Sequence, residues 1–133
     1  MPLVAVGTWL VAALAGGHLL YLWLAGGGLR RQATKVTRFP ATLIFSHMAF
    51  AVTALGCWVV YLLAEDPRYA WISCAVLAVA AFLGFTMFTR WLGGGRHARG
   101  AEQRFPVVAV LLHGLAGVAT FVLVLLAAAL KGG

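Results

Sequence analysis

Pro106-VVAVLLHGLAGVATFVLVLLAAA-Leu130 is the stretch that decides the fold, because it contains no charged side chain along its whole length. About 20 residues of helix, rising 1.5 Å each, cross the hydrocarbon core of a bilayer. Three further uncharged stretches of similar length precede it, namely Leu3–Ala25, Pro40–Ala64 and Tyr69–Thr89. The sequence therefore predicts an all-α protein with four transmembrane helices, arranged up-down-up-down as one bundle.

The composition excludes a water-soluble protein. Of the 133 residues, 63% are hydrophobic and 10% are charged, and the mean hydropathy is +0.97. A soluble domain usually carries about 25% charged residues. We therefore expect a single integral membrane domain over residues 1–133. The sequence holds no paired carboxylates and no nucleophile with an adjacent base, so hydrolase or kinase chemistry has no support.

The positive charge indicates orientation rather than nucleic-acid binding. The net charge is +7 and the isoelectric point is near 10.5, but most basic side chains lie in or beside two loops, Gly26–Phe39 and Gly93–Phe105. The positive-inside rule places such loops in the cytoplasm and both termini outside. Because no basic region precedes Leu3–Ala25, we expect a retained helix rather than a signal peptide. The bias toward Ala, Gly, Val and Arg favours a prokaryotic cytoplasmic membrane.

An internal repeat relates the two halves of the chain. Arg38-Phe39-Pro40 is followed by six residues and then His47, and Arg104-Phe105-Pro106 is followed by six residues and then His113. A tryptophan and a glycine run precede each motif. The sequence therefore predicts two tandem helical hairpins, residues 1–66 and 67–133. Repeats of equal topology are related by an axis along the membrane normal, which places the two histidines at one depth on helices two and four.

The level histidines suggest a haem site. Each lies seven residues inside its helix, which is roughly 10 Å along the axis. Diagonal helices of a four-helix bundle lie about 11–14 Å apart, which suits one haem b with an axial imidazole from each side. Arg38 and Arg104 are expected near the propionates. Small residues within two turns of the histidines would make room for the macrocycle: Ala51, Ala54, Gly114, Ala116, Gly117 and Thr120.

Other readings of these histidines stay open. His18 is expected in the same leaflet, where it would be an alternative ligand, a proton group or a donor to a ligand. Together His18, His47 and His113 would suit copper or zinc. Met87 is a weaker alternative ligand, and His97 is expected to be solvated in a loop. Histidines in membrane helices also serve as purely structural hydrogen-bonding groups.

The four spans with inward-facing His47 and His113 resemble four-helix membrane b-type cytochromes, of the cytochrome b561 kind. This resemblance implies electron transfer through haem b, with a quinol or a membrane redox subunit as partner. Such cytochromes commonly carry two haems, whereas the outer leaflet here contains no histidine. The resemblance therefore implies one haem near the cytoplasmic face.

Two other functions are compatible with the sequence. One is a non-catalytic accessory subunit of a larger respiratory or transport complex, to which the apolar end of helix four would bind. The other is a transition-metal carrier with the three-histidine site. The lipid bilayer is the expected partner in every case, an oligomer is possible, and nucleic acid is excluded. Cys57 and Cys74 are expected at similar depth, where a disulfide is a less favoured alternative to two apolar core residues.

Overall fold

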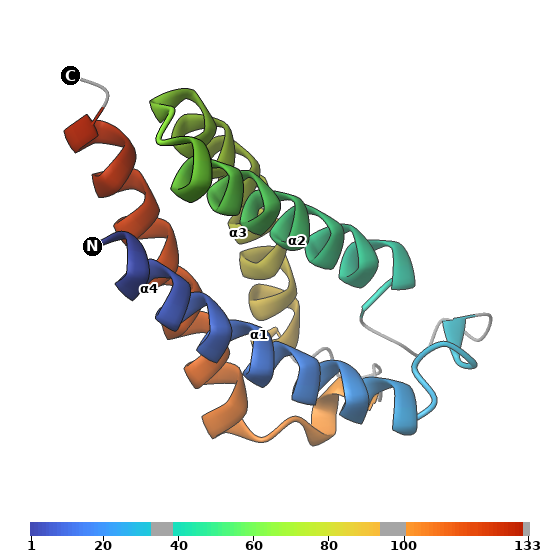
Figure 1. Cartoon of the computed structure of the whole chain (residues 1–133). Helices are drawn as coiled ribbons and strands as arrows, with labels where there is room; N and C mark the ends of the chain where they lie inside the picture. The colour runs from blue at the N-terminus through green and yellow to red at the C-terminus, as the bar shows by residue number, and fades with distance from the viewer. Residues whose placement is uncertain (33–38, 94–100, 132–133) are drawn as a thin grey trace.

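The computed structural model describes residues 1–32, 39–93 and 101–131, and in them the chain is all-helical, as predicted (Figure 1). The elements are α1 (Pro2–Ala25), α2 (Ala41–Ala64), α3 (Pro67–Leu92), the short 3-10 helix η2 (Ala101–Arg104) and α4 (Val107–Lys131). All four α-helices are long and apolar enough to cross a membrane. The chain is therefore a multi-pass membrane protein whose apolar helices contact the lipid bilayer.

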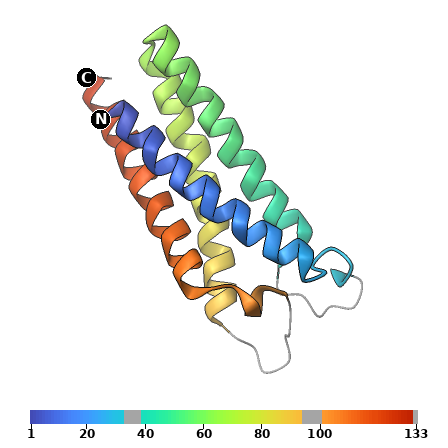
Figure 2. The same ribbon diagram turned by 60° about the horizontal axis from the view of Figure 1, so that its bottom comes forward.

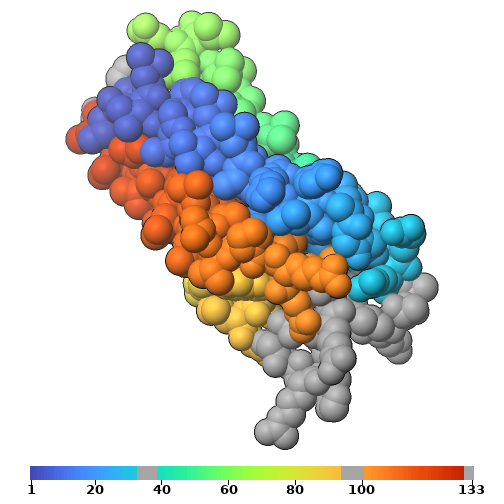
Figure 3. Space-filling view, turned by 90° about the horizontal axis from the view of Figure 1, so that it is seen from below, coloured from blue at the N-terminus to red at the C-terminus, as the bar shows by residue number. Residues whose placement is uncertain are grey.

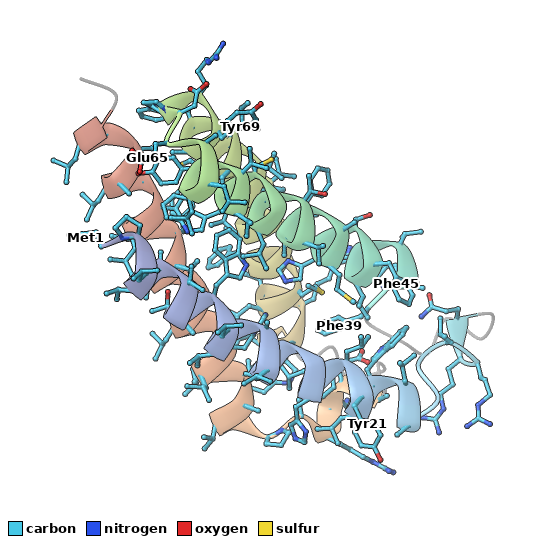
Figure 4. All side chains as sticks on the ribbon, in the orientation of Figure 1. Met1, Tyr21, Phe39, Phe45, Glu65 and Tyr69 are labelled. Carbon is cyan, nitrogen blue, oxygen red and sulfur yellow. The ribbon has the colours of Figure 1, made fainter. Side chains whose placement is uncertain are left out.

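The helices alternate in direction. The chain ends and the α2–α3 link lie at one end of the bundle, and the two longer connections lie at the other (Figures 1 and 2). The labelled side chains show this division, since Met1, Glu65 and Tyr69 lie toward the first end and Phe39 lies toward the second (Figure 4). The predicted up-down-up-down order is confirmed. We call these the terminal end and the loop end.

The closest helix–helix contacts join helices from different halves of the chain. Within the described residues α2 packs most closely on α3 and α1 on α4, whereas the consecutive helices α1 and α2 make few contacts. α1 and α4 run side by side across one face of the molecule (Figure 3). Each half therefore places its first helix against the second helix of the other half. The halves predicted as hairpins, residues 1–66 and 67–133, are interleaved in the bundle.

Two apolar clusters fill the bundle, one toward each end. The outer cluster lies toward the terminal end and contains the large aromatic residues Trp9, Trp58 and Tyr61 among small residues of all four helices. The inner cluster lies toward the loop end, and its buried members are Trp23, Phe39, Ile44, Ala101 and Phe105. Since apolar side chains fill both ends, the polar groups between them require specific partners.

The glycines at the end of α1 have different tasks. Gly27 has a φ of 79°, a backbone conformation that residues with a side chain rarely adopt. It therefore ends the helix, as the sequence predicts. Gly28 is required for space, because a Cβ there would collide with the Trp23 indole. A Cβ at Gly26 would similarly lie 2.7 Å from Cβ of Ala101. Through these two close contacts, the residues that follow α1 pack against Trp23 and Ala101 of the inner cluster.

The tight α2–α3 link is set by three residues. Glu65 adopts the left-handed conformation (φ 54°) that ends α2, and Pro67 begins α3, where its missing N–H is no loss. Asp66 caps α3: its Oδ1 accepts a hydrogen bond from the Arg68 backbone N–H at 2.9 Å. Its Oδ2 also accepts one from Arg68 Nη2 at 2.7 Å. The link therefore combines a helix end and a helix start without spacer residues.

Asp66 is expected to make a small part of the stability dependent on pH. The hydrogen bonds from the Arg68 side chain, and then from its backbone, hold the pKa of the Asp66 carboxyl below its ordinary value of 3.8. Its contribution is therefore complete above pH 3.8 and is lost as the pH falls through the lowered pKa. In a helix-melting experiment in detergent, Asp66→Asn should be slightly less stable than the parent at pH 6, and the difference should be smaller at pH 2. An equal difference at both values would contradict this assignment.

Candidate functional site

His47 and His113 come together between the two clusters. Their imidazole rings lie with centroids 5.9 Å apart and planes at 77°, one from α2 and the other from α4. Both side chains are half-buried. Ile44 and Val110, one turn before each histidine, contact the inner cluster, and Ala51, one turn after His47, contacts the outer cluster. The two repeat-related histidines therefore lie at the same level of the bundle.

Each imidazole is anchored to a backbone carbonyl of a neighbouring helix. His47 Nδ1 lies 2.8 Å from the Ala80 oxygen on α3, and His113 Nδ1 lies 2.8 Å from the Ala12 oxygen on α1. A carbonyl oxygen only accepts, so Nδ1 donates in both cases. Neutral rings therefore present an unprotonated Nε2, and neither Nε2 has a hydrogen-bond partner among the described residues. This is the tautomer in which histidine binds a metal through Nε2.

A glycine makes room for each ring. A Cβ at Gly84 would lie 3.0 Å from Cε1 of His47, and one at Gly16 would lie 2.8 Å from Cε1 of His113. Real Cβ atoms essentially never approach as closely as the second value, so the ring would have to move. The glycines thus allow each imidazole to reach the carbonyl one turn away on the same helix. We call the pairs Ala12/Gly16 and Ala80/Gly84 the imidazole notches.

The two notches are related by the repeat, although they were not among the residues predicted from the sequence. Ala12 and Gly16 precede Trp23 at the same spacing at which Ala80 and Gly84 precede Trp91. Extending the tryptophan alignment toward the N-terminus of each half would have found them. The histidine of each half enters the notch of the other half, so the site has the two-fold symmetry of the repeat. Phe39 and Phe105 are also related by the repeat, and their ring centroids lie 6.1 Å apart on the loop-end side of the pair.

The other predicted ligands lie apart from the pair or outside the described residues. His18 is on the exposed side of α1, and no three His, Cys, Asp or Glu side chains converge within residues 1–32, 39–93 and 101–131. The predicted three-histidine arrangement is therefore absent from the described part of the chain. Met87 packs against the inner cluster. Arg104 is exposed at the end of η2, and Arg38 and His97 lie outside the described residues.

Of the small residues expected around the site, some are buried in the bundle and others have open space beside them. Ala54 and Thr120 are buried, and Thr120 Oγ1 donates to Thr8 Oγ1 at 2.8 Å across the α1–α4 contact. A Cβ at Gly117, one turn after His113, would meet nothing within 4 Å. Gly114 is exposed, so it does not face the histidine pair as predicted. Of these residues, Ala54 and Thr120 are therefore used in packing, and Gly117 and Gly114 have open space beside them.

The cysteines take no part in this site. Cys74 is buried in the outer cluster and Cys57 is half-buried, and both are free thiols. The interpretation of them as core residues is consistent with this placement. The thiols are not near enough to the histidines to form a mixed ligand group in the described residues.

Two imidazoles would suit an axially coordinated haem better than a bare metal ion. Metal–imidazole bonds of about 2 Å on each side would place the two Nε2 atoms about 4 Å apart, and the ring centroids about 6 Å apart. The observed distance between the ring centroids is 5.9 Å, which is compatible with that spacing. A bare zinc ion needs three or four ligands, and the described residues offer two imidazoles. Haem supplies four equatorial nitrogens itself, so two imidazoles complete its coordination.

Comparison with protein-family models, with curated proteins and with solved structures finds no match for this chain. The functional argument therefore depends on the geometry of the histidine pair.

Proposed function

We propose that this protein is a b-type cytochrome of the membrane that holds one haem between α2 and α4, with His47 and His113 as the axial ligands. The observation that supports this proposal is the matched pair of imidazoles. Each is anchored through Nδ1, and the ring centroids are 5.9 Å apart. The resemblance to cytochrome b561-like proteins is part of the same proposal.

A haem in this site would supply one-electron chemistry, by cycling between ferric and ferrous iron. The chain contributes the environment. The carbonyls of Ala12 and Ala80 fix the orientation of the rings and raise the basicity of the bound nitrogens, which favours the ferric state. The apolar clusters on both sides lower the local dielectric, which disfavours the additional charge of the ferric state. The reduction potential reflects the balance of these two effects.

The site lies nearer to the loop end than to the terminal end, because each histidine is seven residues from the proline that precedes its helix. The basic loops Gly26–Phe39 and Gly93–Phe105 would place this end in the cytoplasm of a prokaryote and both termini outside. The aromatic outer cluster fills the other half of the bundle. Electrons would therefore enter and leave on the loop-end side, in exchange with a quinol or a redox subunit.

A haem titration tests the proposed function. The purified protein in detergent should bind one ferric haem per chain and give a low-spin spectrum with two imidazole ligands. On reduction it should give an α-band at the b-type position. A preparation that stays colourless in the presence of haem overturns the proposal. Stoichiometric copper or zinc by elemental analysis in that preparation would favour the metal carrier, and its absence would favour the accessory subunit.

A further inference from the structure

Trp23 has a buried hydrogen-bond donor that no group of the described chain accepts. Its side chain is 1% exposed, and its Nε1 has no hydrogen-bond partner. Leaving a buried N–H unsatisfied costs about 1–3 kcal/mol. Native proteins rarely tolerate such donors, and each one that remains requires an explanation.

The repeat provides the comparison that makes this donor unusual. Trp91 occupies the equivalent position in the second half, and its Nε1 donates to the Glu102 backbone oxygen at 3.1 Å. Both tryptophans lie seven residues, or two helical turns, beyond the glycine of an imidazole notch. The same indole in the same position is thus satisfied by protein in one half and left available in the other.

Trp23 lies on the loop-end side of the histidine pair. It belongs to the inner cluster, together with Phe39 and Phe105, and two turns of helix separate it from Gly16, which contacts His113. Two turns correspond to roughly 10 Å. Trp58 also has an unpartnered Nε1, but it is eleven residues beyond His47 in the outer cluster. Of these two donors, Trp23 is therefore the one on the loop-end side of the pair.

From this placement we infer that the Trp23 indole N–H donates a hydrogen bond to a carboxylate of the ligand held by His47 and His113. This inference rests on the proposed function, and for a haem the carboxylate is one of the two propionates. A carboxylate is the appropriate acceptor because hydrogen bonds to charged groups offset the desolvation of both partners most effectively.

The experiment compares Trp23→Phe with Trp91→Phe, each titrated with haem and with iron etioporphyrin, whose side chains carry no carboxyl group. Trp23→Phe should weaken haem binding about tenfold, which corresponds to the loss of one hydrogen bond to a charged group. It should weaken etioporphyrin binding about twofold or less. Trp91→Phe should change the affinity for both porphyrins by the same factor, because its partner is a backbone oxygen.

A second measurement observes the donor directly. In the reduced protein labelled with ¹⁵N at its tryptophans, the Trp23 indole N–H signal, identified by its loss in Trp23→Phe, should exchange more slowly with deuterium after haem binds. Equal weakening of both porphyrins by Trp23→Phe, together with unchanged exchange, would overturn the inference. That outcome leaves the low-spin spectrum of the parent protein intact, whereas failure of the proposed function removes it.

Discussion

Replacing His47 or His113 with alanine is expected to abolish the low-spin haem spectrum and to lower haem affinity more than about 100-fold. Loss of a group that only orients a ligand costs about 10–100-fold, so loss of the ligand itself should exceed that range. Each variant keeps one imidazole, so residual haem should be five-coordinate and high-spin. Absorption spectra and haem titrations of both variants measure these changes.

His18→Ala is the matched control for these variants, since His18 is a third histidine of the membrane-spanning helices and is exposed on α1. Its spectrum and affinity should equal those of the parent. Imidazole added to His47→Ala should restore the six-coordinate spectrum, which separates loss of a ligand from loss of the fold. Haem binding that is lost in His18→Ala but kept in His47→Ala would contradict the assignment of His47 as a ligand.

The second large effect is expected from Gly16→Ala, because its new Cβ would lie 2.8 Å from Cε1 of His113. The ring must then turn away from the Ala12 oxygen, and the hydrogen bond that orients it is lost. We expect haem affinity to fall about tenfold, within the range for removal of an orienting partner. Gly84→Ala should act on His47 in the same direction but more weakly, since the corresponding distance is 3.0 Å.

Gly17→Ala is the control for this substitution. It lies next to Gly16 on α1, but a Cβ there would meet nothing within 4 Å. Both substitutions gain about 0.5–1 kcal/mol of helix propensity. Gly17→Ala should therefore be neutral or stabilising in thermal unfolding and should leave haem binding unchanged, whereas Gly16→Ala should lose both stability and affinity. Identical behaviour of the two variants would mean that the notch does not position His113.

Charge and length were sufficient to predict the helices. The uncharged stretch Tyr69–Thr89 underestimates α3, which extends over Pro67–Leu92, because a count that stops at charged residues misses a helix whose last turn carries Arg90. The depth of the two histidines also follows from the sequence, since equal spacing from a proline in two repeats gives equal height in the bundle.

The partners of the histidines could not be predicted in the same way. His47 and His113 hydrogen-bond to the backbone oxygens of Ala80 and Ala12. Every residue has a backbone oxygen, so the residue types in the sequence do not indicate which ones accept. The two glycines do leave such a mark, but glycine is common in this chain and several others have open space around them. The pairing of α1 with α4 rather than α2 requires knowledge of which faces meet, and nearly uniform apolar helices contain little of that information.

The crossed insertion of the histidines also determines when the site can form during synthesis. The acceptor for His47 lies 33 residues farther along the chain, and the acceptor for His113 lies 101 residues back. When α1 and α2 have entered the membrane, the Ala12/Gly16 notch is empty and His47 has no acceptor. Only insertion of the last helix satisfies both imidazoles. A ribosome that stops before α4 therefore leaves a product that lacks His113 and in which the Ala12/Gly16 notch stays empty.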